Sequence, residues 1–102
     1  MKQNVQMILR YEIKTPFLEQ YQEVMKEITK MLPTFEANGF QLNQSNHNPN
    51  QVIEKINLPT VAHYYALKKL RKSNKHNVFG ILDQMISGGL SEMECWALKT
   101  KM

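Results

Sequence analysis

The chain has 102 residues, 42% of them hydrophobic and 22% charged, which is typical of a globular protein and excludes wholesale disorder. The formal net charge of +4 is too small to predict nucleic-acid binding by itself. A single cysteine, Cys95, excludes an intrachain disulfide framework and a cysteine-cluster metal site. No apolar run approaches the length of a membrane span or a signal peptide. We therefore expect one domain over residues 1–102, in the cytoplasm.

The first predicted element is a strand over residues 5–14. Its side chains alternate between an apolar face and a more polar face, the period-two pattern of a strand. The apolar face comprises Val5, Met7, Leu9, Tyr11 and Ile13, and the other face comprises Gln6, Ile8, Arg10, Glu12 and Lys14.

An amphipathic helix is predicted next, with Thr15 as its N-cap and Pro16 at its first helical position. Apolar residues recur every three or four positions from Phe17 to Phe35. Pro33 predicts a kink or a short restarted turn, and Asn38-Gly39 predicts the end of the helix.

Two further strands and a second helix follow. A strand begins at Phe40, a polar turn spans residues 43–50, and another strand spans residues 51–57. Thr60 is the predicted N-cap of the second helix. We expect the inward arc of that helix to comprise Ala62, Tyr65, Ala66 and Leu70, and the opposite arc to comprise Tyr64, Lys68, Arg71 and Lys72.

The remaining elements complete a ferredoxin-like α+β fold. A short helix is predicted over residues 78–86, Gly88-Gly89 ends it, and a last strand covers residues 92–100. The element order is then βαββααβ. Such an order favours a four-stranded antiparallel sheet with the helices on one face.

The sheet face without helices is predicted to form a homodimer interface. The last strand has apolar side chains on both faces, because Met93, Cys95 and Ala97 alternate with Trp96 and Leu98. A sheet face open to water should be more polar than this. Two copies paired sheet to sheet would cover the apolar side chains.

The layout resembles the dimeric α+β barrel superfamily, which includes antibiotic-biosynthesis monooxygenase-like and NIPSNAP-like domains. The resemblance lies in the segment QVIEKINLPTVAHYYALKKL and in the ending SGGLSEMECWALKTK. It covers nearly the whole chain in layout. The resemblance implies a dimer. The superfamily includes both cofactor-free oxygenases and domains without an assigned activity. Fold does not determine function, so catalysis and simple binding both stay open.

The candidate site residues follow from their places in this layout. His63 borders the apolar arc of the second helix, so it is a candidate acid or base, or a structural histidine. Arg10 is a candidate anion-binding residue or an interface ion pair with Glu54 or Glu94. Tyr11, Tyr65 and Trp96 are the candidate ligand-binding aromatics, although packing is the alternative for each of them.

Several other functions are disfavoured by the sequence. The three histidines lack metal-ligand spacing, so no metal or other cofactor is expected. His76 could suit a haem site, but the tryptophan and asparagine that haem-degrading relatives carry are missing from EKIN and MILRYEI. The cations from Lys68 to Lys75 predict no specific nucleic-acid binding, since no aromatic beyond Tyr64 and Tyr65 is interleaved with them. An RNA-recognition motif shares the element order, but the third strand, QVIEKIN, lacks the stacking aromatics that it needs. The predicted function is a cytoplasmic homodimer that binds an apolar or aromatic small molecule, with cofactor-free monooxygenase-like activity or with no catalysis.

Overall fold

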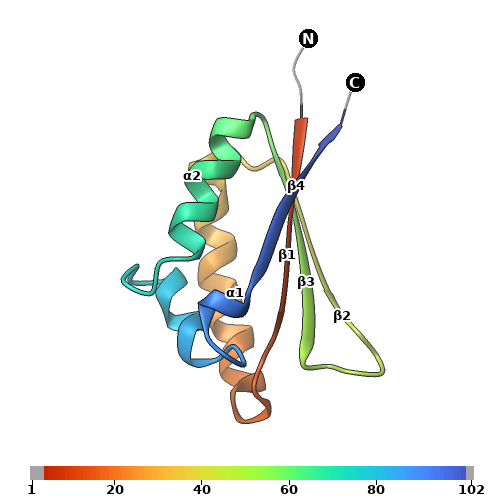
Figure 1. Ribbon diagram of the computed structural model, residues 1–102, viewed down its shortest axis with the longest axis vertical. Helices are drawn as coiled ribbons and strands as arrows, with labels where there is room; N and C mark the ends of the chain where they lie inside the picture. The colour runs from red at the N-terminus through yellow and green to blue at the C-terminus, as the bar shows by residue number, and fades with distance from the viewer. Residues whose placement is uncertain (1–3, 101–102) are drawn as a thin grey trace.

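The computed structural model describes residues 4–100 and confirms the ferredoxin-like architecture (Figure 1). Four antiparallel strands are hydrogen-bonded in the order β2-β3-β1-β4, so β1 and β3 are central. Both helices lie on one face of the sheet, and the other face is uncovered (Figure 1). The strands and helices are β1 (Asn4–Glu12), α1 (Leu18–Met31), β2 (Gly39–Gln44), β3 (Gln51–Leu58), α2 (Val61–Arg71) and β4 (Glu94–Thr100). Short 3-10 helices are η1 (Thr15–Phe17), η2 (Leu32–Phe35), η3 (Phe79–Gln84) and η4 (Leu90–Glu92).

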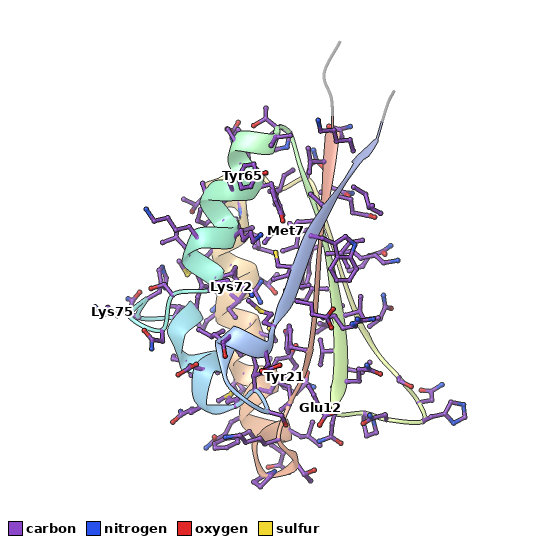
Figure 2. All side chains as sticks on the ribbon, in the orientation of Figure 1. Met7, Glu12, Tyr21, Tyr65, Lys72 and Lys75 are labelled. Carbon is purple, nitrogen blue, oxygen red and sulfur yellow. The ribbon has the colours of Figure 1, made fainter. Side chains whose placement is uncertain are left out.

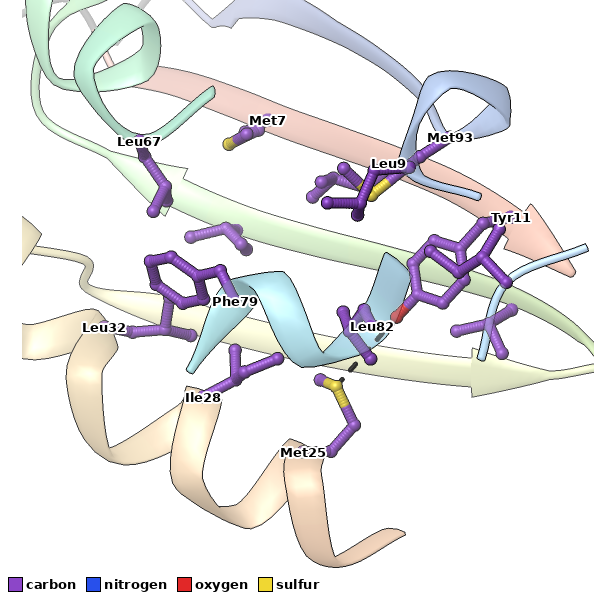
Figure 3. Packing of buried hydrophobic residues seen from close by; sticks show 14 of the residues in the cluster. Met7, Leu9, Tyr11, Met25, Ile28, Leu32, Leu67, Phe79, Leu82 and Met93 are labelled. Atoms are coloured by element: carbon purple, nitrogen blue, oxygen red, sulfur yellow. Dashed lines mark hydrogen bonds between the residues drawn. The ribbon is translucent and has the colours of Figure 1, made fainter. Parts of the chain in front are cut away.

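The hydrophobic core lies between the sheet and the helices. Alternate residues of β1 point into this layer, as the period-two pattern predicted, and Met7 and Leu9 are fully buried. Side chains from α1, α2 and η3 fill the space opposite them, including Ile28, Leu67 and Phe79 (Figure 3).

The open face of the sheet keeps an apolar strip at β1 and β4. Ile8 pairs with Trp96 across the two strands, and Leu98 lies two residues further along β4 on the same face. Trp96 is 36% exposed and Leu98 is 49% exposed. The predicted division of β4 into two faces is confirmed, because Cys95 and Ala97 pack on the core side.

Some predicted element boundaries are wrong. The last strand begins at Glu94, because residues 90–92 form η4 instead. The predicted helix over residues 78–86 is the 3-10 helix η3. Thr15 does not cap a helix, since it lies inside η1 and its hydroxyl accepts a hydrogen bond from the Asn50 side chain at 3.0 Å.

Other boundary predictions are confirmed. Pro33 lies in the 3-10 turn η2, which follows α1 directly. The side chain of Thr60 accepts a hydrogen bond from the backbone N–H of His63 and so caps α2.

The predicted helix end at Gly88-Gly89 is wrong, because η3 ends at Gln84; the two glycines lie in the turn before η4, with φ values of +79° and +81°, a region that glycine enters without a steric penalty. Among the described residues, no helix is long and apolar enough to cross a membrane.

Candidate functional site

A cluster of four polar side chains is buried between the sheet and the helices. Tyr11 comes from β1, Tyr21 from α1, Glu54 from β3 and Arg71 from the end of α2; we call these four residues the buried cluster. None of the four is more than 4% exposed. A charged pair in such surroundings is tolerated only when each charge is paired and hydrogen-bonded.

The contacts within the buried cluster form one continuous chain. The Arg71 guanidinium donates to both carboxylate oxygens of Glu54, with Nη1–Oε1 at 2.9 Å and Nη2–Oε2 at 2.6 Å. The Tyr11 hydroxyl contacts Glu54 Oε2 as well, and the hydroxyls of Tyr11 and Tyr21 are 2.6 Å apart. Tyr11 therefore donates to the carboxylate and Tyr21 donates to Tyr11. Figure 3 shows the Tyr11 hydroxyl pointing toward α1, where Met25 lies.

Burial and charge keep the two tyrosines neutral. Burial raises the pKa of Tyr11 well above its usual value, and the nearby Glu54 carboxylate raises it further. The same two causes raise the pKa of Tyr21. For Arg71, burial lowers the pKa, but the Glu54 carboxylate outweighs that effect and the net shift is upward. The buried cluster thus holds two neutral phenols beside a carboxylate and a guanidinium.

The strand and helix patterns explain how the cluster assembles. Glu54 has the same parity as the buried residues Val52 and Ile56, so the β3 alternation turns its carboxylate inward. Arg71 lies four residues after the buried Leu67 on α2. The parity of Glu54 is visible in the sequence, and a carboxylate at an inward strand position is the signal that could have revealed the cluster. The predicted exposed position of Arg71 is wrong.

The rotation of α2 also corrects the prediction for its two tyrosines. Tyr65 is 61% exposed, whereas Tyr64 is buried. The inward arc of α2 is formed by Tyr64, Leu67 and Arg71, and this arc brings Arg71 to Glu54 in the core. Burial raises the pKa of Tyr64 to about 12, and the nearby Cys95 adds to the shift. Tyr65 therefore does not face the layer where we expected a ligand.

Arg10 and Trp96 meet on the open face of the sheet, away from the buried cluster. Arg10 forms a two-pronged ion pair with Glu94, with Nη2 at 2.8 and 2.9 Å from the two carboxylate oxygens. The Arg10 guanidinium carbon is 5.8 Å from the centre of the Trp96 ring. Of the two predicted carboxylate partners, Glu94 is confirmed. The prediction that Glu54 pairs with Arg10 is wrong, because the Glu54 side chain faces the helices.

His63 lies at the far end of the sheet from Arg10. It follows Leu58, which pairs with Val5, whereas Arg10 pairs with Ile53. Five residues of strand separate these positions, about 16 Å at the usual rise. His63 Nε2 is 2.7 Å from the Glu36 carboxylate, and Nδ1 is 2.6 Å from the Thr60 hydroxyl. The predicted grouping of His63 with Arg10 and Tyr11 is therefore wrong.

One pocket brings together two of the predicted site residues. It has a volume of about 240 Å³ and opens at the end of β1 beside η4. Carboxylates dominate its charge, with Glu12, Glu92 and Glu94 against one arginine. The full lining is Arg10, Tyr11, Glu12, Gln51, Ser87, Glu92 and Glu94. Tyr11 lines this pocket, and its hydroxyl belongs to the buried cluster.

Comparison with solved structures places the fold among known proteins. A cofactor-independent oxygenase from Streptomyces nogalater, determined as a variant, superposes with a TM-score of 0.70 at 9% sequence identity, covering 97% of this chain and 94% of that chain. An antibiotic biosynthesis monooxygenase superposes with a TM-score of 0.68 at 9% identity, covering 96% and 97%. A dimeric ferredoxin-like protein of unknown function from Jannaschia superposes with a TM-score of 0.69 at 10% identity, covering 95% and 99%.

This chain has the fold of the antibiotic-biosynthesis monooxygenase-like proteins. The fold-level resemblance drawn from the sequence is confirmed, and its NIPSNAP-like part stays a prediction. The sequence matches no protein-family model and no curated protein. Identities near one residue in ten establish the monooxygenase-like fold alone, so function must be argued from the side chains.

Proposed function

We propose that this protein works as a homodimer, paired through the open sheet face, that binds an apolar or aromatic small molecule. The observation that carries the dimer is the strip formed by Ile8, Trp96 and Leu98, which includes the exposed large apolar side chains of β4. Exposed aromatic and aliphatic residues on an uncovered sheet are typical of protein interfaces. Figure 2 shows that no helix within residues 4–100 reaches this side of the sheet.

The charges on the open face suit pairing between identical copies. Arg10 and Glu94 neutralise each other within one chain, and Lys55 and Glu12 have opposite signs. A face that combines an apolar strip with balanced charges meets its own copy without net repulsion. The dimeric ferredoxin-like protein from Jannaschia shows that this fold occurs as a dimer in another protein.

Analytical ultracentrifugation of Trp96→Glu tests the dimer. A charge placed in the strip should shift the protein from dimer to monomer at micromolar concentration, because the carboxylate would be buried unpaired. Tyr65→Glu is the matched control, since it makes the same kind of change on α2, across the core from the open face. The proposal fails if Trp96→Glu remains as dimeric as the control.

A cofactor-free oxygenase reaction is the second candidate function. The observation that favours it is the pair of neutral tyrosine hydroxyls held against Glu54 between the sheet and the helices. Both phenol protons are donated within the cluster, so a substrate oxygen would receive a hydrogen bond from Tyr11 only after displacing its contact with Glu54. The complete burial of the cluster favours binding or a structural role instead, because a substrate would first have to open the core.

Two measurements separate these candidates. Native mass spectrometry of protein purified from its host should show a dimer with a retained small molecule. Oxygen uptake with that molecule then tests catalysis, with Tyr11→Phe as the variant and Tyr65→Phe as the exposed control. Uptake that Tyr11→Phe abolishes supports the oxygenase. Retention of the molecule without oxygen uptake supports a binding protein.

A further inference from the structure

Three side chains at the start of α2 form a chain of hydrogen bonds separate from the buried cluster. The Thr60 hydroxyl lies 2.6 Å from His63 Nδ1, and His63 Nε2 lies 2.7 Å from Glu36 Oε2. A nucleophile, a base and a carboxylate that orients the base stand in this relation in enzymes that attack acyl groups. Thr60 and Glu36 are exposed, and the His63 side chain is 28% exposed, so solutes can reach the three residues.

The hydrogen-bond pattern assigns the protons. Glu36 is a carboxylate and accepts, so the proton on neutral His63 lies on Nε2. Nδ1 is then an acceptor, and the Thr60 hydroxyl donates to it. The same hydroxyl oxygen accepts from the backbone N–H of His63 at 3.2 Å, which fixes its position as the N-cap of α2. The hydroxyl proton of Thr60 is thereby aimed at a basic nitrogen.

Backbone features around these residues favour the same chemistry. Glu36 adopts a φ of +59°, which a glutamate enters only at a conformational cost, and this left-handed turn presents its carboxylate to His63. The first backbone N–H groups of α2 beside Thr60 have no partner inside the helix. Such groups stabilise the negative oxygen that develops when a carbonyl is attacked.

We propose that Thr60 is an activated nucleophile that accepts an acyl group from a small activated ester. The Thr60 oxygen bonds to the acyl carbon, its proton passes to His63 Nδ1, and the ester C–O bond breaks. The leaving oxygen takes the proton from His63. Glu36 holds the imidazole in orientation throughout and is a positioning residue. This proposal is independent of the dimer and of the buried cluster.

Acetylation by p-nitrophenyl acetate tests the proposal on the full chain. Intact mass and peptide mapping should show one acetyl group on Thr60, formed faster than on any other hydroxyl. His63→Ala should slow this acetylation about a hundredfold, the usual contribution of a general base. His47→Ala is the control, because His47 lies in an exposed turn between β2 and β3 and should leave the rate unchanged.

Further variants separate the chemistry from the capping role of Thr60. Thr60→Asn retains an N-cap acceptor but has no hydroxyl, so it should fold normally and lose the acetylation. Thr60→Ser should keep both. Glu36→Gln should slow acetylation about tenfold, which is less than the loss of the base itself. Absence of acetyl on Thr60, or acetylation that His63→Ala leaves unchanged, would overturn the proposal.

Discussion

Glu54 and Arg71 show how strongly a single buried charge depends on its partner. Both side chains are fully buried, so the pair has no water to replace a lost contact. Arg71 Nε has no hydrogen-bond partner among the described residues, while the guanidinium carbon lies 5.6 Å from the centre of the Phe79 ring. Removing one partner of such a pair leaves an uncompensated charge in the core.

Glu54→Gln should therefore destabilise the protein by about 3–5 kcal/mol. The matched control is Glu27→Gln, which breaks the exposed ion pair with Lys30 on α1 and should cost about 1 kcal/mol or less. Urea unfolding followed by circular dichroism measures both changes. Equal losses in the two variants would show that burial does not determine the strength of the Glu54–Arg71 pair.

The two buried tyrosines predict a loss of stability in alkali. Each has a pKa above its unfolded value near 10, so the folded protein holds these protons more tightly than the unfolded chain. Their contribution is fully present below about pH 10 and decreases as the pH rises beyond it. Tyr21→Phe should flatten the fall of the melting temperature above about pH 10. Tyr65→Phe, which changes an exposed phenol, should leave that slope unaltered.

Among the elements, the turn before β4 depends most directly on the backbone conformation of its glycines. Gly88 has a φ of +79°, and a Cβ added there would lie 2.4 Å from Glu92 Cγ. Gly88→Ala should cost about 1–2 kcal/mol in the free energy of unfolding, because an L residue is strained in this region. The variant Gly88→Ala/Glu92→Ala removes the steric contact but retains the backbone strain. If it regains full stability, the contact and not the backbone would be the cause.

Which face of helix α2 is buried depends on the elements around it. The apolar periodicity of α2 is weak, so the sequence allows more than one inward arc. The arc that contains Tyr65 carries more apolar side chains than the arc that contains Tyr64 and Arg71. In the structure the arc with Tyr64 and Arg71 faces inward, and Arg71 pairs there with the Glu54 carboxylate. Helix α1 has one continuous apolar stripe, which buries Tyr21, Met25 and Ile28 as predicted.

At the scale of the whole molecule, the proposed dimer should respond weakly to salt. The open face combines the apolar strip with two cations, Arg10 and Lys55, and two anions, Glu12 and Glu94, among the described residues. Salt screens charges but leaves apolar burial in place. Raising the ionic strength from about 0.05 M to about 0.5 M should change the dimer dissociation constant by less than about tenfold. Sedimentation at a series of concentrations measures it, and a steeper loss would indicate an interface built mainly on ion pairs.

The sequence by itself determined the element order, the inward face of β1, the two-sided character of β4 and the cap at Thr60. Each of these is a local property, because strand alternation and capping depend on residues a few positions apart. The open face with Trp96 follows from the same alternation once the helices are assigned to one side.

Only the tertiary structure decided which polar residues meet. Arg10 and Tyr11 are neighbours in sequence but lie on opposite faces of the sheet, and register places His63 at the far end. Glu54 and Arg71 come from two different elements, and they meet in the core because α2 is rotated by one position from the predicted arc. Pairing between distant residues depends on strand register and helix rotation, and short-range periodicity does not contain either quantity.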